Sequence, residues 1–197
     1  MLAYFLTLIG YLLTFTLIFG LTKNLTVAII AKILVTCALL FYFRKHFKFR
    51  VNFDLLAIAA GLFIAFQWIV LEGYYPLLGE DVIYNYSRID IFFKLLIGVV
   101  IAPVIEEFFT RFFLMRFIIE KNWQKVRIGT YSLTSFIVTI MYFGFSHNRW
   151  LVGIITAIIL NLLIYRRKNI ESCILAHAVA NLALGIYVIA TGAFFFW

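Results

Sequence analysis

The chain has 197 residues, of which 65% are hydrophobic and only 13% are charged. A soluble domain is usually apolar at about half of its positions, so this composition excludes a soluble protein and indicates an integral membrane protein. The formal charge of +8 does not indicate nucleic-acid binding, because the basic residues are divided among separate short loops and form no basic stripe.

Long apolar segments predict transmembrane helices. The chain is rich in Phe and has only two Pro, whereas a membrane β-barrel would alternate apolar and polar residues in short segments. A helix needs about 20 residues to cross the bilayer. Seven segments approach this length and predict an all-α bundle in one integral membrane domain, residues 1–197: Leu2–Leu21, Leu25–Phe43, Phe53–Leu71, Ile91–Ile119, Thr130–Ser146, Trp150–Tyr165 and Ile170–Ala190.

The loops predict the orientation of this bundle. The first segment has no basic region before it and no small-residue cleavage site, so we expect a retained helix and not a removed signal peptide. Three basic loops, residues 44–50, 116–127 and 166–168, fall on one side if seven helices alternate. Cytoplasmic loops carry the excess of Lys and Arg. We therefore expect a multi-pass protein of the cell membrane, with its N-terminus inside and its C-terminus outside.

The fourth segment carries Glu106, Glu107 and Arg111 within an apolar run. Ionisable groups at membrane depth mark functional sites by default, although the glutamates could also serve only to bind neighbouring helices. Glu107 and Arg111 share a helix face at a spacing of four, so we expect a buried pair, while Glu106 lies about 100° away without that partner. Pro103 removes a backbone donor, which should free the carbonyl of Val99 and open a wet cavity.

Two further polar pairs lie in the C-terminal half at helical spacing, Phe143 with His147 and His177 with Asn181. A rise of about 1.5 Å per residue from the cytoplasmic helix ends places Glu106, His147, His177 and Asn181 near the middle of the membrane. A single membrane histidine is more often a packing donor than a catalyst. Three polar clusters at similar depth favour one shared site.

This set of side chains can perform hydrolysis. Glu106 can take a proton from water with His147 orienting that water, and His177 and Asn181 can donate hydrogen bonds to the oxyanion that forms. The same Glu and His side chains could instead hold zinc. We favour a metal-free site without a cofactor, because no two histidines have the spacing of helical zinc proteases and the nearest supporting carboxylate, Glu107, is already paired with Arg111.

These motifs, in order and in three successive parts of the bundle, resemble those of the CPBP intramembrane proteases, a family that includes the CAAX prenyl protease and bacterial Abi proteins. The resemblance covers roughly residues 91–190 and rests on Glu106-Glu107-x-x-x-Arg111, Phe143-x-x-x-His147 and His177-x-x-x-Asn181. It implies a glutamic-type intramembrane endopeptidase. In that family the residues matching Glu106 and His147 activate water, those matching His177 and Asn181 form the oxyanion hole, and those matching Glu107 and Arg111 support the site.

More narrowly, the short connection from His147 to Trp150 and the ending from Ala190 to Trp197 look like the branch associated with exosortase-type C-terminal sorting systems. This implies a membrane protein or peptide substrate with a C-terminal transmembrane sorting signal, cleaved in or near that segment within the lipid bilayer. The chain departs from the broader family in this short connection and in lacking an eighth helix. The family's prenyl-cysteine specificity is therefore not carried over.

Two alternatives use other chemistry. Cys173 and His177 are also four residues apart and could form a thiolate site, but that site would leave Glu106 and His147 unused. The alternative outside enzymology is a non-enzymatic membrane carrier or an immunity-type binding protein that uses the buried Glu and His cluster. A carrier would usually show two repeated halves, and the sequence shows no such repeat.

Overall fold

The computed structural model describes residues 1–50, 52–80 and 82–197, and these residues are helical without strands. The predicted all-α bundle is confirmed. Short π-helices interrupt the fourth segment, and short 3₁₀ turns follow it and end the chain. The elements are α1 (Leu2–Thr22), α2 (Leu25–Tyr42), α3 (Leu55–Val70), α4 (Arg88–Leu96), η1 (Ile97–Ile101), α5 (Ala102–Glu107), η2 (Phe108–Leu114), α6 (Met115–Ile119), η3 (Trp123–Lys125), α7 (Leu133–Phe145), α8 (Trp150–Arg167), α9 (Ile170–Thr191) and η4 (Phe194–Phe196).

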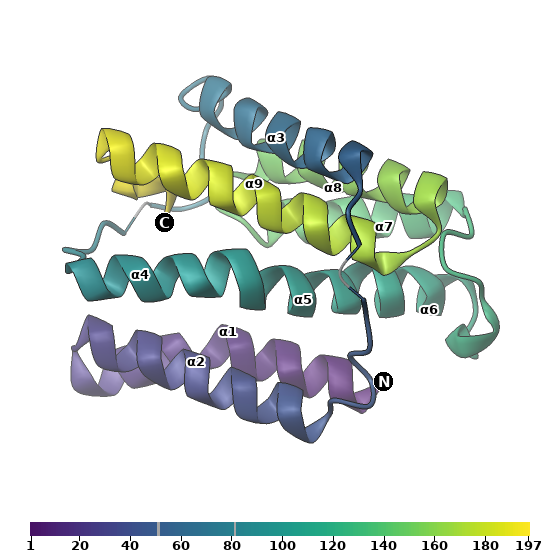
Figure 1. Cartoon of the computed structure of the whole chain (residues 1–197), viewed down its shortest axis with the longest axis horizontal. Coiled ribbons are helices and arrows are strands. Elements are labelled where there is room, and N and C mark those ends of the chain that lie inside the picture. The colour runs from purple at the N-terminus through teal and green to yellow at the C-terminus, as the bar shows by residue number, and fades with distance from the viewer. Residues whose placement is uncertain (51, 81) are drawn as a thin grey trace.

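The elements from α4 to α6 form one continuous rod through the centre of the molecule. The α1–α2 pair lies on one side of this rod, and α3, α7, α8 and α9 lie on the other (Figure 1). The rod begins at Arg88, three residues before the predicted start, because Ser87 and Asp90 form a capping box. The Asp90 Oδ2 accepts from the Ser87 amide at 2.9 Å, and the Ser87 Oγ accepts from the Asp90 amide at 3.3 Å.

The core lies where the rod meets its neighbours. Ile105, Phe108 and Phe113 are at most 1% exposed, and the ring of Tyr4 from α1 stacks on Phe113 with 5.6 Å between centroids. Membrane helices associate through van der Waals packing of this kind, because lipid chains are as apolar as the side chains themselves. Aromatic packing therefore fixes the rod in position on its α1 side. The polar residues of the rod can then face α9.

Helices α3 and α9 pack very closely around Gly61. A Cβ added at this position would collide with the main-chain carbonyl oxygen of Ala176 and with the side chain of Val179. Helices α7 and α8 meet in a similar way at two glycines, because a Cβ on Gly153 would lie 3.1 Å from the Cα of Gly144. Small residues allow such close approach between membrane helices.

We expect Gly61→Val to destabilise the protein by about 1–3 kcal/mol or more, since a backbone carbonyl cannot move aside as a flexible side chain can. Thermal unfolding in detergent, followed by circular dichroism, measures the effect. Gly20→Val is the matched control, because nothing lies within 4 Å of a Cβ built on Gly20. An unchanged melting midpoint for Gly61→Val would contradict the close α3–α9 contact.

Four of the helices are long and apolar enough to cross a membrane, namely α1, α2, α8 and α9. This supports a multi-pass membrane protein. Helices α3 and α7 are shorter than the segments predicted for them, with 16 and 13 residues. Asp54 caps α3 and starts it at Leu55, while a turn at Ser146 ends α7. The two chain ends lie at opposite ends of the bundle (Figure 1), and which end faces the cytoplasm stays a prediction.

Candidate active site

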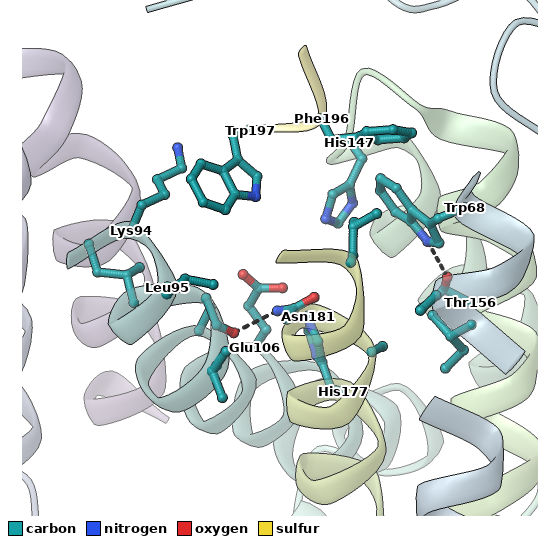
Figure 2. Close-up of a pocket in the computed structure, with 18 of the residues that line it drawn as sticks. Trp68, Lys94, Leu95, Glu106, His147, Thr156, His177, Asn181, Phe196 and Trp197 are labelled. Carbon is teal, nitrogen blue, oxygen red and sulfur yellow. Dashed lines mark hydrogen bonds between the residues drawn. The ribbon is translucent and has the colours of Figure 1, made fainter. Parts of the chain in front are cut away.

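One cavity of about 350 Å³ lies between the central rod and helices α3 and α9, and the turn between α7 and α8 contributes to it. Glu106 reaches it from α5, His147 from the turn, and His177 and Asn181 from α9 (Figure 2). Residues from three distant parts of the sequence therefore share one wall. The four side chains that were predicted to converge all line this cavity.

Glu106 and His147 also line a second cavity of about 60 Å³, on the side of α1. The carboxylate of Glu106 and the imidazole of His147 extend into the main cavity from opposite sides (Figure 2). A volume of this size accommodates a few water molecules, and the two polar side chains supply partners for them. Glu106 and His147 therefore lie between the two cavities, where a water from the smaller cavity could reach the main one.

His147 lies just beyond α7, not within it. Helix α7 ends at Phe145 with Ser146 as its cap. The predicted pair of Phe143 and His147 is therefore not on one helix, and a hydrogen bond connects the two residues instead. The Nδ1 atom of His147 lies 2.7 Å from the Phe143 carbonyl oxygen. Because a carbonyl can only accept, Nδ1 carries a proton, and Nε2 of the neutral ring keeps its lone pair. His147 can therefore accept a proton at Nε2.

His177 contacts Glu107 directly. Its Nδ1 lies 2.8 Å from the Glu107 Oε1, and this same oxygen accepts from the Arg111 Nη1 at 3.1 Å. The predicted Glu107–Arg111 pair is confirmed, and both side chains are fully buried. The expectation that Arg111 alone occupies Glu107 is wrong, because one carboxylate oxygen serves both partners. Glu107 thereby orients the His177 ring.

Arg111 is held by a network that the sequence analysis missed. Its Nε donates to the Asn161 Oδ1 at 3.2 Å, and the Asn161 Nδ2 donates to the Thr139 Oγ1 at 3.0 Å. The guanidinium also lies over the Phe143 ring, 4.6 Å from the centroid. The available signal was a single Asn within the apolar helix α8, since polar residues inside membrane helices usually have a partner.

The π-helix before Pro103 explains how Asn181 is placed. The Ala102 amide donates to the Ile97 carbonyl, five residues back. In that register the next acceptor is Gly98, whose donor would be Pro103, which has no N–H. The Asn181 Nδ2 donates to the Gly98 oxygen at 2.6 Å instead. The free carbonyl expected at Val99 is thus shifted by one residue, because the helix is π and not α.

The family model described as Type II CAAX prenyl endopeptidase Rce1-like matches residues 88–183. The part of the chain from residue 88 to residue 183 is similar to this family. The match begins at the start of α4 and contains Glu106, His147, His177 and Asn181 as well as Glu107 and Arg111. Searches of curated proteins and of solved structures found no match to the chain. This similarity supports an intramembrane endopeptidase in general terms, with membrane proteins as the class of substrate.

The Glu and His side chains of the cavity can be compared with the ligands of a zinc site. Among the residues that the structure describes, no group of three or more His, Cys, Asp or Glu side chains is arranged to hold a metal ion. The contact of Glu107 with His177 is the kind of support that a metal-bound histidine often has. A supporting carboxylate alone does not make a metal centre.

Several residues around the endopeptidase cavity were not expected from sequence. Trp68 packs edge-on against the His147 ring, with 5.9 Å between centroids, and its Nε1 donates to the Thr156 Oγ1 at 2.8 Å. Lys32, Lys94, Phe196 and Trp197 also line the wall. Cys173, the alternative nucleophile, is fully buried, donates to the Leu160 carbonyl and is not among the described residues that line the cavity.

Proposed function

We propose that the protein is a metal-independent, glutamic-type intramembrane peptidase. It hydrolyses a peptide bond in or near the C-terminal membrane segment of a substrate protein. The observation that carries this proposal is the position of Glu106 and His147, which line both cavities and extend toward a common space (Figure 2). Activation of a water requires a proton acceptor within hydrogen-bond reach, and Glu106 and His147 supply two.

In the proposed reaction, water lies between the Glu106 carboxylate and the Nε2 of His147. Glu106 takes a proton from the water as its oxygen bonds to the carbonyl carbon of the scissile peptide. The carbonyl oxygen becomes the oxyanion of a tetrahedral intermediate. The C–N bond then breaks, and the leaving nitrogen receives the proton from Glu106. The products are a new carboxyl terminus and a new amine.

Asn181 and His177 are proposed as donors to the oxyanion. The Asn181 amide uses one hydrogen on Gly98 and has a second to donate. With Nδ1 directed at Glu107, His177 donates from Nε2 only as an imidazolium. The adjacent Glu107 carboxylate is the anion that such an imidazolium would face, although it shares its oxygen with Arg111. Preorganised donors of this kind are often the largest single contribution to such catalysis.

The cavity supports an apolar substrate segment. Its wall includes aliphatic and aromatic side chains from several helices, among them Ile64, Trp68, Ile97 and Leu184. An extended peptide leaving a membrane helix can bury apolar side chains here while its carbonyls reach the polar cluster. We therefore propose a substrate with a C-terminal transmembrane sorting signal, in line with the exosortase-associated branch that the sequence resembles.

The experiment is cleavage of membrane peptides with and without metal chelators. Purified protein in detergent is treated with EDTA and 1,10-phenanthroline and then given a set of peptides that end in a transmembrane segment and short basic tail. We expect cleavage by the treated protein at the untreated rate, with products identified by mass spectrometry. Activity lost to the chelators and restored by added zinc would replace the metal-free mechanism. Absence of cleavage across the set, by protein that is folded, would contradict the peptidase.

A further inference from the structure

Two lysines of the cavity have no anionic partner. Lys32 of α2 and Lys94 of α4 both line it, and among the described residues neither ammonium makes an ion pair or hydrogen bond. The contact that each ammonium does make is with an aromatic ring. The Lys32 Nζ lies 3.7 Å from the centroid of Tyr11, and the Lys94 Nζ lies 5.7 Å from that of Tyr86. An ammonium held on a ring face keeps its donors available for a ligand.

The charge of the cavity wall is therefore unbalanced. Lys32, Lys94 and Glu106 are its charged side chains apart from the histidines. They leave one excess positive charge, and the imidazolium proposed for His177 would add a second. Glu107 does not compensate it, because it is buried against Arg111. An uncompensated charge at membrane depth is costly, and such groups usually face a ligand or a pathway. A ligand that brings negative charge would offset this excess.

Lys94 also lies far enough along the rod from Glu106 to act on another part of a substrate. Lys94 precedes Glu106 by twelve residues on the same rod, which corresponds to about 18 Å between their Cα atoms at the rise of a helix. Lys94 lies beside Trp197, and Glu106 comes from the next turns of the rod (Figure 2). An extended peptide covers about 3.3–3.6 Å per residue, so about five residues separate the two positions.

We propose that Lys32 and Lys94 form a carboxylate-binding subsite that recognises the peptide substrate on one side of the bond to be cleaved, with Lys94 about five residues from that bond. The carboxylate is either the terminal carboxylate of the peptide or an acidic side chain. This inference rests on the proposed peptidase function, because it places the subsite and the hydrolytic cluster on one bound peptide. Two ammonium donors on a carboxylate provide charge-assisted hydrogen bonds, which are stronger than neutral ones.

The test is peptide binding to Glu106→Gln protein in a non-ionic detergent, read by the fluorescence of the tryptophans in the cavity wall. The probes are N-acylated hexapeptides of alternating Leu and Ala with either a free carboxylate or a carboxamide end. We expect the free carboxylate to bind about tenfold more tightly. A further amidated pair, ending in Glu or in Gln, separates the two sources. Preference for Glu over Gln assigns side-chain carboxylates to the subsite, and its absence assigns the terminal carboxylate.

The variants locate the preference. Lys32→Gln and Lys94→Gln should each remove most of it, whereas Lys32→Arg and Lys94→Arg should keep it and confirm that the positions tolerate substitution. Lys121→Gln, in an exposed loop, is the matched control and should bind as the parent does. Equal affinity for the carboxylate and carboxamide peptides, or a preference that survives both Gln variants, would overturn the subsite.

A lipid headgroup is the competing occupant. If phosphatidylglycerol, but not phosphatidylcholine, displaced both peptides and these bound equally well, the lysines would belong to a lipid site and the proposal would be overturned. The result does not depend on catalysis, because the tested protein lacks the proposed base. Failure of the subsite would leave the chelator experiment unaffected, and failure of that experiment would leave the lysine-dependent preference measurable.

Discussion

Glu106→Gln is expected to abolish peptide hydrolysis while the protein stays folded and still binds substrate. Gln has nearly the same size as Glu but cannot take a proton from water. A positioned general base contributes about 10²–10⁴-fold to the rate, so kcat/KM should fall by at least that factor. Within the described residues Glu106 has no ion-pair or hydrogen-bond partner, so the substitution should cost little stability. The measurements are cleavage rate, peptide affinity and melting midpoint on the same preparation.

Glu106→Asp distinguishes the peptidase from a proton-coupled carrier. Asp keeps the charge but places the carboxylate one methylene further from His147, and a base that is misplaced by about 1 Å can lose about 10²-fold in rate. A proton relay would tolerate this change and still move protons, because a relay needs only a titrating group at that depth. Hydrolysis by Glu106→Gln at the rate of the unchanged protein would show that another group activates the water.

The helical class and most helix positions could be predicted because hydropathy dominates a membrane protein. Each apolar segment was found with ends that differ by only a few residues. The differences have local causes. The Ser87–Asp90 capping box starts the rod earlier than the fourth predicted segment, and the Asp54 cap shortens α3. Such caps are visible in sequence only once a helix start is known. Hydropathy does not supply that position.

The polar cluster could be predicted from depth, but its contacts could not. Counting along each helix placed four side chains at one level of the membrane, and they line one cavity. The partner of each side chain depends on how the helices are rotated. Glu107 therefore contacts His177 as well as Arg111, and Asn181 donates a hydrogen bond to the Gly98 carbonyl. The latter follows from a π-helix whose register no hydrophobic pattern encodes.

Lys32 illustrates the same limit. From the sequence it was a charge within a helix without an evident partner, and periodicity could not indicate the ring of Tyr11 on another helix as its neighbour. Only the three-dimensional arrangement places it with Lys94 on the cavity wall. The Glu107–Arg111 pair, in contrast, is local and was predicted correctly, because both residues are on one helix.

Arg111→Ala is expected to destabilise the protein by about 3–5 kcal/mol, the usual cost of removing one partner of a buried ion pair. It would leave the Glu107 carboxylate fully buried with His177 as its remaining partner, since among the described residues Oε2 has no hydrogen bond. Asn161 would lose the group to which its Oδ1 is bonded, and the ring of Phe143 would lose its cation. Folding should therefore fail before chemistry does. Thermal and denaturant unfolding in mixed micelles measure the change.

Arg167→Ala provides the matched control, because its ion pair with Asp54 involves a guanidinium side chain that is 38% exposed. Exposed pairs contribute about 0–1 kcal/mol, so this variant should melt close to the unchanged protein. The double variant Glu107→Gln with Arg111→Met separates pairing from position, since it removes both charges together and should recover part of the stability lost in Arg111→Ala. If Arg111→Ala instead melted normally and lost only cleavage, Arg111 would act on the reacting groups and Glu107 would be stabilised by His177 alone.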